Sequence, residues 1–229
     1  GGEEGGTRGS QGSRAVGCEG RGAALQDEGG SDVPRRGYPG VAVATSQDMG
    51  KKLTACPEGS HVHRTIQRFL DARSKAIETG QRIDWSTAEA LAFGSLLLEG
   101  TPVRLSGQDS ERGTFSQRHS VLIDQENEDR HTPLNYLADK QGRFEVINSM
   151  ISEEAVLGFE YGYSLAEPNA LTVWEAQFGA FANGAQVLFD QFISSGERKW
   201  LRMSALVCPF PSAYEGPAQV HSSARLERF

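Results

Sequence analysis

The feature that most constrains the fold is an alternation of short apolar runs with helical patterns from residue 103 onward. Strands are predicted at 103–105, 121–123, 144–147, 171–174 and 205–208. Helices are predicted between them at 153–165 and 182–194, and Gly196 follows the second helix as a stop signal. Strands that alternate with helices favour a mainly parallel sheet with helices on both faces. The predicted fold class is therefore α/β, doubly wound.

Two further helices are predicted before the first strand. One spans residues 62–79, where apolar residues recur near helical spacing, although Arg73 interrupts the apolar stripe. The other begins with Ser86 and Glu89, which match an S-x-x-E capping box in which each side chain binds a free backbone N–H. Gly100 is the predicted end of this second helix.

Residues 1–50 differ in composition from the rest of the chain. They hold 14 of the 27 glycines and a single aromatic residue, Tyr38. Such a segment buries too little apolar surface to offset the entropy lost on ordering. We therefore expect residues 1–50 to be disordered, either as a linker or as non-native sequence upstream of a truncated gene. The first residue is not methionine, which favours a processed product or a fragment of a larger protein.

Charge, hydropathy and cysteine content exclude several classes of protein. The net charge of −7 disfavours a general nucleic-acid-binding protein, which needs clustered basic side chains. No apolar run reaches about 18 residues, so no membrane-spanning helix is predicted. The three cysteines are widely spaced and form no C-x-x-C pair, a pattern typical of a reducing compartment.

Three segments near predicted strands have the residue types of a binding site, and each also has a simpler structural explanation. Glu153 and Glu154 open an apolar helix, where they complement the helix dipole or place one carboxylate in a pocket. Residues 174–181 combine aromatic and small side chains, which form either ordinary core or a stacking wall for a flat ring. The polar, glycine-containing segment 107–119 is either a surface loop or a loop with ligand contacts. Open α/β sheets bind ligands beyond the carboxyl ends of their strands, which strengthens the binding interpretation.

Two histidine-containing clusters raise the hypothesis of a metal site. His61 and His63 precede a helix without a third ligand nearby, and the acidic segment 124–131 has the composition of a solvated loop. Neither has the ligand spacing of usual zinc sites, so we predict no metal site. His221, near the end of the sequence, is by itself more typical of a structural or exposed histidine.

Four segments, taken in order, resemble the first component of 2-oxoglutarate dehydrogenase. They are RLSGQDSERGTFSQRH, INSMISEEAVLGFEYGYS, VWEAQFGAFANGAQVLFDQFISSGE and VHSSARLERF. The resemblance covers roughly residues 53–229. It implies a transketolase-like pyrimidine-binding domain, a doubly wound fold that binds the aminopyrimidine ring of thiamine diphosphate. We expect this domain at 51–229, truncated at its C-terminal end.

The resemblance also implies two catalytic residues. Glu153 matches the family's activating glutamate, and Glu154 is the less favoured candidate. A carboxylate that is hydrogen-bonded to the pyrimidine nitrogen promotes the proton transfer that activates the cofactor. His221 matches a histidine near the substrate, which is suited to orienting the oxo acid or to transferring a proton.

Four cofactor-binding positions follow from the same resemblance. Phe178 and Phe181 match an aromatic wall, Gln108 matches a polar contact, and Asp109 is a weaker match of the same kind. The segment 209–220 departs from the family, because a histidine and two glycines of the family pattern are absent. Pro217 fixes φ and removes a backbone donor, so we expect the local geometry around His221 to depart from that of the family.

The family's diphosphate-binding domain, which holds the magnesium ion, has no counterpart in this sequence, and neither does the family's C-terminal domain. The implied partners are the diphosphate-binding domain of the same enzyme, a second copy in a homodimer, and a lipoyl-bearing acyltransferase component. We expect no nucleic-acid or membrane partner and no activity of this chain by itself. The implied location is the bacterial cytoplasm or the mitochondrial matrix.

Three functions follow as hypotheses. The first is a part of the enzyme that decarboxylates 2-oxoglutarate and transfers the succinyl group to a lipoyl carrier; a 2-oxoadipate enzyme shares most of its motifs. The second is a catalytically silent dimerisation or assembly module of the same fold, which the altered segment 209–220 favours. The third and weakest is a metal-dependent hydrolase.

Overall fold

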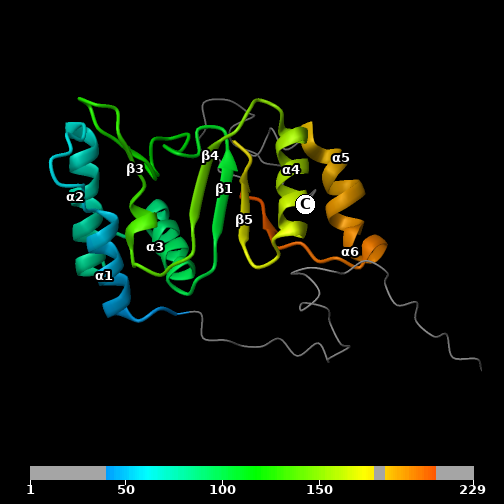
Figure 1. The fold of residues 1–229 in the computed structure, drawn as a ribbon, viewed down its shortest axis with the longest axis horizontal. Coiled ribbons are helices and arrows are strands. Elements are labelled where there is room, and N and C mark those ends of the chain that lie inside the picture. Colours follow the sequence, from blue (N-terminus) through cyan, green and yellow to red (C-terminus); the bar gives the residue numbers. More distant parts are fainter. Residues whose placement is uncertain (1–39, 178–183, 210–229) are drawn as a thin grey trace, which may run out of the picture.

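A computed structural model describes residues 40–177 and 184–209. Its centre is a four-stranded sheet of order β4-β1-β5-β6, in which all neighbouring strands are parallel (Figure 1). The strands are β1 (Val103–Gly107), β4 (Phe144–Asn148), β5 (Leu171–Glu175) and β6 (Leu206–Val207). The predicted α/β class with a mainly parallel sheet is confirmed.

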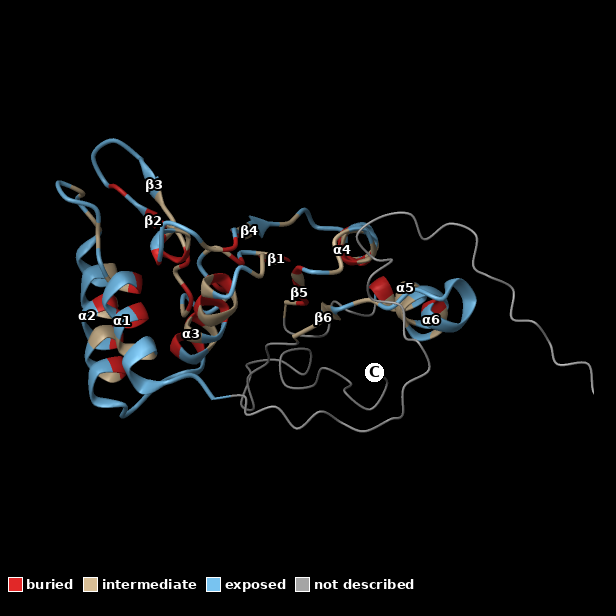
Figure 2. Ribbon diagram, turned by 60° about the horizontal axis from the view of Figure 1, so that its bottom comes forward, coloured by how far each residue is buried: buried red, intermediate tan, exposed pale blue. Residues whose placement is uncertain are grey.

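Helices cover both faces of this sheet (Figure 2). On one face α3 (Trp85–Leu98) lies next to the strands, and α1 (Val43–Leu53) and α2 (Arg64–Thr79) lie beyond it. On the other face lie α4 (Glu153–Ala166), α5 (Gln186–Leu188) and α6 (Ser194–Trp200). None of the helices in the described ranges is long and apolar enough to cross a membrane.

Alternate side chains of the strands supply two separate cores. Val103 and Leu105 of β1 belong to the cluster that includes residues of α1 and α3, and they are 0% and 1% exposed. Trp174 of β5 belongs to the other cluster, together with Leu157 of α4. Successive side chains of a strand point to opposite faces of a sheet. Each face of the sheet therefore packs against its own layer of helices.

One predicted strand lies outside the parallel sheet. β2 (Leu122–Ile123) pairs antiparallel with β3 (Arg130–His131) in a separate two-stranded sheet. The turn between them is held by the Asp124 carboxylate, which accepts hydrogen bonds from two backbone N–H groups of the turn and from that of His61. The strand predicted at 121–123 is therefore confirmed as β2, but it lies outside the parallel sheet, because the acidic residues after it form a hairpin turn. A short 3₁₀ helix (Pro133–Tyr136) then leads towards β4.

The first helix contradicts the prediction that residues 1–50 are disordered as a whole. In α1, Met49 and Leu53 are 1% and 3% exposed and belong to the core that α3 shares. Gly50 is buried as well, and a Cβ added there would lie 2.5 Å from Cγ2 of Ile77 in α2. This glycine lets α1 and α2 approach closely. The high glycine content of residues 1–50 therefore gives no indication of the packed helix that begins within this segment. Residues 1–39 lie outside the described part of the chain.

The capping box predicted at Ser86 and Glu89 is also wrong. The cap of α3 is Asp84, whose Oδ1 accepts a hydrogen bond of 2.7 Å from the backbone N–H three residues later. Ser86 and Glu89 bind arginines instead. Oγ of Ser86 accepts from Nη2 of Arg73 at 3.0 Å, and Oε2 of Glu89 accepts from Nε of Arg118 at 2.7 Å. Aspartate and serine are both good caps, and the sequence offers both within three residues.

The helix predicted at 182–194 is less regular and extends further. From α5 the chain passes through a π-helical turn (Phe189–Ile193) into α6, which ends at Trp200; residues 182–183 are not described. Gly196, the predicted stop, lies inside α6. A side chain at this position would collide with the Tyr161 hydroxyl of α4. The glycine therefore allows α6 to pack closely on α4 and does not end the helix.

We predict that Met49→Ala lowers the free energy of unfolding by about 2–5 kcal/mol, because it leaves a cavity in the core. Val43→Ala in the same helix should change it by less than about 0.5 kcal/mol, since Val43 is 72% exposed. Urea denaturation of the full chain, followed by circular dichroism, measures both values. Equal effects of the two substitutions would contradict the packing of α1 described above.

Candidate functional site

Two parallel strands and one helix bring polar residues together at one edge of the sheet. β1 ends at Gly107 and β5 ends at Glu175, and these two residues are register partners. Gln108 begins the loop after β1, and Glu153 is the first residue of α4. The carboxyl ends of parallel strands are where open α/β sheets bind ligands. The candidate site therefore lies at this edge.

The central contact of the site joins Gln108 to Glu153. Nε2 of Gln108 donates a hydrogen bond of 2.8 Å to Oε1 of Glu153. Glu153 is half-buried, whereas its neighbour Glu154 is exposed. Ser152, the N-cap residue, makes no side-chain capping hydrogen bond. The geometry thus distinguishes the two acids: Glu153 faces the loop after β1, and Glu154 faces solvent.

A small recess adjoins this pair. It is lined by Gln108, Ser149, Met150, Glu153, Val156, Trp174, Glu175, Ala176 and Gln177. Its volume is about 10 Å³, which is room for about one water molecule. Gly184 lies on another side of the carboxylate, since a Cβ added there would be 3.7 Å from Oε2 of Glu153. The described residues form the polar edge of a site and do not enclose a ring-sized chamber.

The structure places Asp109 outside this recess. Asp109 is exposed, its φ of 54° is left-handed, and its Oδ2 accepts from Nη2 of Arg112 at 3.2 Å. Its side chain therefore binds within its own loop. Phe178, Phe181 and His221 lie outside the described residues, and the roles implied for them stay predictions.

A buried ion cluster that the sequence analysis missed lies beneath the loop. Arg118 is 5% exposed; its Nε donates to Oε2 of Glu89 at 2.7 Å, and its Nη1 donates to Oε1 of Glu175 at 3.2 Å. Its Nη2 donates to both carboxylates. Burial disfavours the charged guanidinium, but the hydrogen bonds and charges of the two glutamates outweigh burial and raise the pKa of Arg118. The available signal in the sequence was Glu175, a carboxylate that directly ends an apolar strand.

A second arginine, which is half-buried, fixes α4 to the sheet. Nε and Nη2 of Arg104 in β1 donate to the two carboxylate oxygens of Glu160 at 2.7 and 3.0 Å. Nη1 donates to Glu145 of β4 at 3.0 Å. Burial disfavours this charge too, but the two glutamates outweigh it and raise the pKa of Arg104. The arginine therefore ties the helix that carries Glu153 to the centre of the sheet.

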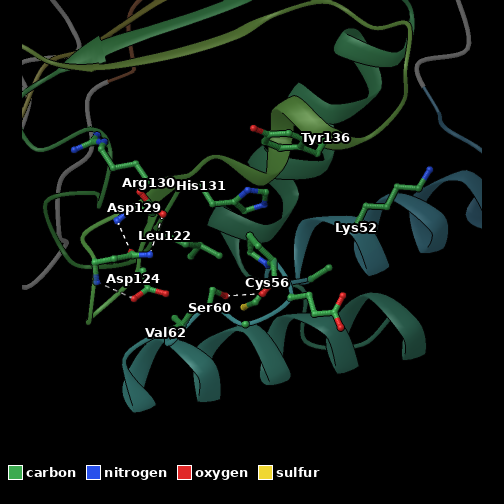
Figure 3. A pocket seen from close by; sticks show the side chains of 15 residues that line it. Lys52, Cys56, Ser60, Val62, Leu122, Asp124, Asp129, Arg130, His131 and Tyr136 are labelled. Carbon is green, nitrogen blue, oxygen red and sulfur yellow. Dashed lines mark hydrogen bonds between the residues drawn. The ribbon is translucent and has the colours of Figure 1, made fainter.

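A larger cavity, of about 690 Å³, lies between the α1–α2 connection and the β2–β3 hairpin (Figure 3). Cys56, Asp124 and His131 are among its lining residues, and His131 stacks on Tyr136 with 4.7 Å between ring centroids. None of the residues that line this cavity also lines the recess at Glu153. It is therefore a separate feature of the molecule.

The histidines considered for a metal site have other partners. Nδ1 of His63 accepts from the backbone N–H of Thr65 at 3.2 Å and caps α2. Nδ1 of His61 lies 3.4 Å from Oε2 of Glu126. Within residues 40–177 and 184–209, no group of three or more histidine, cysteine, aspartate or glutamate side chains is placed to hold a metal ion.

Fold and site together define a doubly wound α/β domain with a paired carboxylate and amide at its strand ends. Residues 81–229 match the family described as the pyrimidine binding domain of transketolase, and the chain belongs to this family. All six residues assigned by resemblance lie within the matched range.

The chain is similar to proteins named "2-oxoglutarate dehydrogenase E1 component". It is 65% identical over 211 residues to those of Brucella canis and Brucella suis, and 64% identical over 211 residues to that of Brucella anthropi. Each match covers 92% of this chain and 21% of the relative, so the chain spans about a fifth of the length of these relatives. Because 211 of 229 residues are matched, the segment 1–50 does not lie wholly outside the similarity.

We predict that Gly107→Ala lowers the free energy of unfolding by about 1–3 kcal/mol, because an added Cβ would lie 2.5 Å from the carbonyl oxygen of Glu175. Gly162→Ala in α4 is the matched control. Among the described residues, and apart from the backbone of its own helix and its chain neighbours, no atom lies within 4 Å of a Cβ added there. Alanine favours a helix, so stability should rise by up to about 1 kcal/mol. Urea denaturation measures both, and a neutral Gly107→Ala would contradict the close approach of β1 and β5.

Proposed function

We propose that this chain supplies the pyrimidine-binding part of a thiamine-diphosphate-dependent enzyme that decarboxylates 2-oxoglutarate and passes the succinyl group to a lipoyl carrier. The observation that carries the proposal is the contact between Glu153 and Gln108 at the start of α4. The family assignment and the names of the Brucella relatives support it. Since the chain spans only 21% of those relatives, the activity, substrate and partners of the whole enzyme are part of the proposal.

The cofactor supplies a ring that accepts the electron pair left on the substrate carbon when carbon dioxide leaves. In this proposal one oxygen of the Glu153 carboxyl group would share a proton with the pyrimidine nitrogen of the cofactor. Gln108 holds the other oxygen, Oε1, and so fixes the orientation of the carboxyl group. A proton-sharing group is effective only when its geometry is fixed, which is the function we assign to this hydrogen bond.

The chemistry of the described residues fits an aminopyrimidine. A carboxyl group and a carboxamide together provide donors and acceptors for a ring nitrogen and an amino group. The buried aromatic side chain of Trp174 lies in the wall of the same recess. We assign the stacking wall to Phe178 and Phe181 and the substrate-side histidine to His221. These residues and further domains supply the rest of the chamber in this proposal.

Several finer assignments belong to the same proposal. The partners are a diphosphate-binding domain that holds magnesium, a second copy of the chain, and a lipoyl-bearing acyltransferase component. The substrate is 2-oxoglutarate in preference to 2-oxoadipate, and the location is the bacterial cytoplasm. The names and the bacterial sources of the relatives support the last two assignments.

A silent assembly module is the second candidate, and one specific observation favours it. Met150, Ile151 and Phe159, beside or on α4, are 76%, 88% and 61% exposed. Large apolar side chains that are exposed to this extent suit an interface with another protein surface. Such an interface would persist in a domain that had lost its catalytic partner.

We predict that the full chain, mixed with a separately made diphosphate-binding part of a Brucella relative, restores release of carbon dioxide from 2-oxoglutarate. Glu153→Gln should then lower kcat/KM by roughly 10²- to 10⁴-fold, because the amide keeps the size of the side chain but cannot exchange the proton. The assay needs thiamine diphosphate and magnesium in the buffer.

Glu154→Gln is the matched control, since Glu154 is exposed in the same helical turn, and its rate should stay near that of the unmodified chain. Equal losses for the two variants would count against the assignment of Glu153. A chain that dimerises in sedimentation analysis but restores no turnover supports the silent module.

A further inference from the structure

The loop that carries Gln108 is closed by its own backbone. The N–H of Arg118 donates to the carbonyl oxygen of Arg112 at 2.9 Å, and the N–H of Ser120 donates to the carbonyl oxygen of Glu111 at 2.8 Å. The end of the loop therefore lies against its beginning. The backbone at Arg118 is therefore tied to the part of the loop that follows Gln108.

The Arg118 side chain adds contacts that lead towards Gln108. Its Nη1 donates to the carbonyl oxygen of Ser110, two residues after Gln108, at 3.0 Å. Ser110 is fully buried. The same guanidinium binds Glu175, which lines the recess at the end of β5, and Glu89 on α3. One side chain thus binds the loop, the end of β5 and α3 together.

We propose that Arg118 is a positioning residue, which keeps the Gln108 amide on the Glu153 carboxylate by holding the loop between α3 and β5. Its side-chain bonds go to the loop and to two glutamates outside the Gln108–Glu153 pair, so it acts on Glu153 through Gln108. The catalytic consequence rests on the proposed function. The structural consequence concerns this chain alone.

The arrangement needs an arginine and not merely a positive charge. A guanidinium presents five N–H donors in one plane, which lets it bind two carboxylates and a carbonyl oxygen together. A lysine has a single ammonium group on a flexible side chain. It keeps the charge but cannot bind all three of these acceptors together in the same geometry. Arg118→Lys should therefore keep the fold, loosen the loop and leave Glu175 less firmly held beside the recess.

The structural consequence is tested by NMR of the Gln108 side-chain amide in the full chain. Glu153→Ala calibrates the signal, because it removes the acceptor of this amide. We expect Arg118→Lys to shift the signal in the same direction as Glu153→Ala. Arg112→Lys is the control, since Arg112 is exposed in the same loop and pairs with Asp109, and it should leave the signal unchanged.

An unshifted Gln108 signal in folded Arg118→Lys would overturn the inference. Should that variant fail to fold, Glu89→Gln offers a milder change, because it keeps an acceptor for Nε of Arg118 but removes one charge of the cluster. It should move the Gln108 signal in the same direction by a smaller amount. An unmoved signal in Glu89→Gln would then overturn the inference in turn.

The catalytic consequence is tested by a double-mutant cycle in the restored enzyme. We expect Arg118→Lys and Gln108→Ala each to lower kcat by about 10- to 100-fold, because both misplace the same carboxylate. The double variant should be no slower than Gln108→Ala. A purely structural arginine would give independent losses that multiply, and this result would contradict positioning through Gln108. Lack of turnover with the unmodified chain would count against the proposed function, and the NMR measurement would still decide the positioning role.

Discussion

The candidate site depends on the backbone pairing of β1 with both of its neighbours. Every residue of β1 has a register partner in β4 on one side and in β5 on the other. A central strand that is paired on both edges cannot slide without breaking two ladders and turning its apolar side chains to the wrong face. The point at which Gln108 leaves the sheet, beside Glu175, is therefore set by the core and not by the loop. The polar side chains of the candidate site therefore lie beside the end of a strand whose position is fixed.

Two arginines, the buried Arg118 and the half-buried Arg104, connect β1 and its following loop to the surrounding layers. Arg104 joins β1 to α4 through Glu160, and Arg118 joins the following loop to α3 and β5 through Glu89 and Glu175. Buried ion pairs contribute little net stability compared with apolar side chains of the same volume, but removing one partner leaves an uncompensated charge. Their effect here is to define geometry. They fix the two elements that carry Gln108 and Glu153 relative to one another.

Elements with clear apolar patterns could be predicted from the sequence, and long-range polar contacts could not. The strand predicted at 144–147 and the helix predicted at 153–165 agree closely with β4 and α4, because a run of apolar residues or a helical stripe is a local signal. The quoted motifs assign roles to Glu153 and Gln108, and the structure shows that these two side chains share a hydrogen bond. Arg118 and Glu175 are 57 residues apart, and no local sequence pattern indicates that their side chains form an ion pair. The glycine content of residues 1–50 predicts disorder at Gly50 as well, because composition does not distinguish a glycine that packs against Ile77 from one in a linker.

The contact of Gly196 with Tyr161 joins two helices that the sequence separates by a strand. Since the tyrosine hydroxyl occupies the space where a side chain at 196 would start, only a hydrogen atom fits there. A larger residue at 196 becomes acceptable once position 161 has shrunk, for example to phenylalanine or leucine. During evolution, Tyr161 must therefore be replaced by a smaller residue before Gly196 can be replaced by a larger one. Such an order would make these two positions vary together across species, although neither belongs to the candidate site.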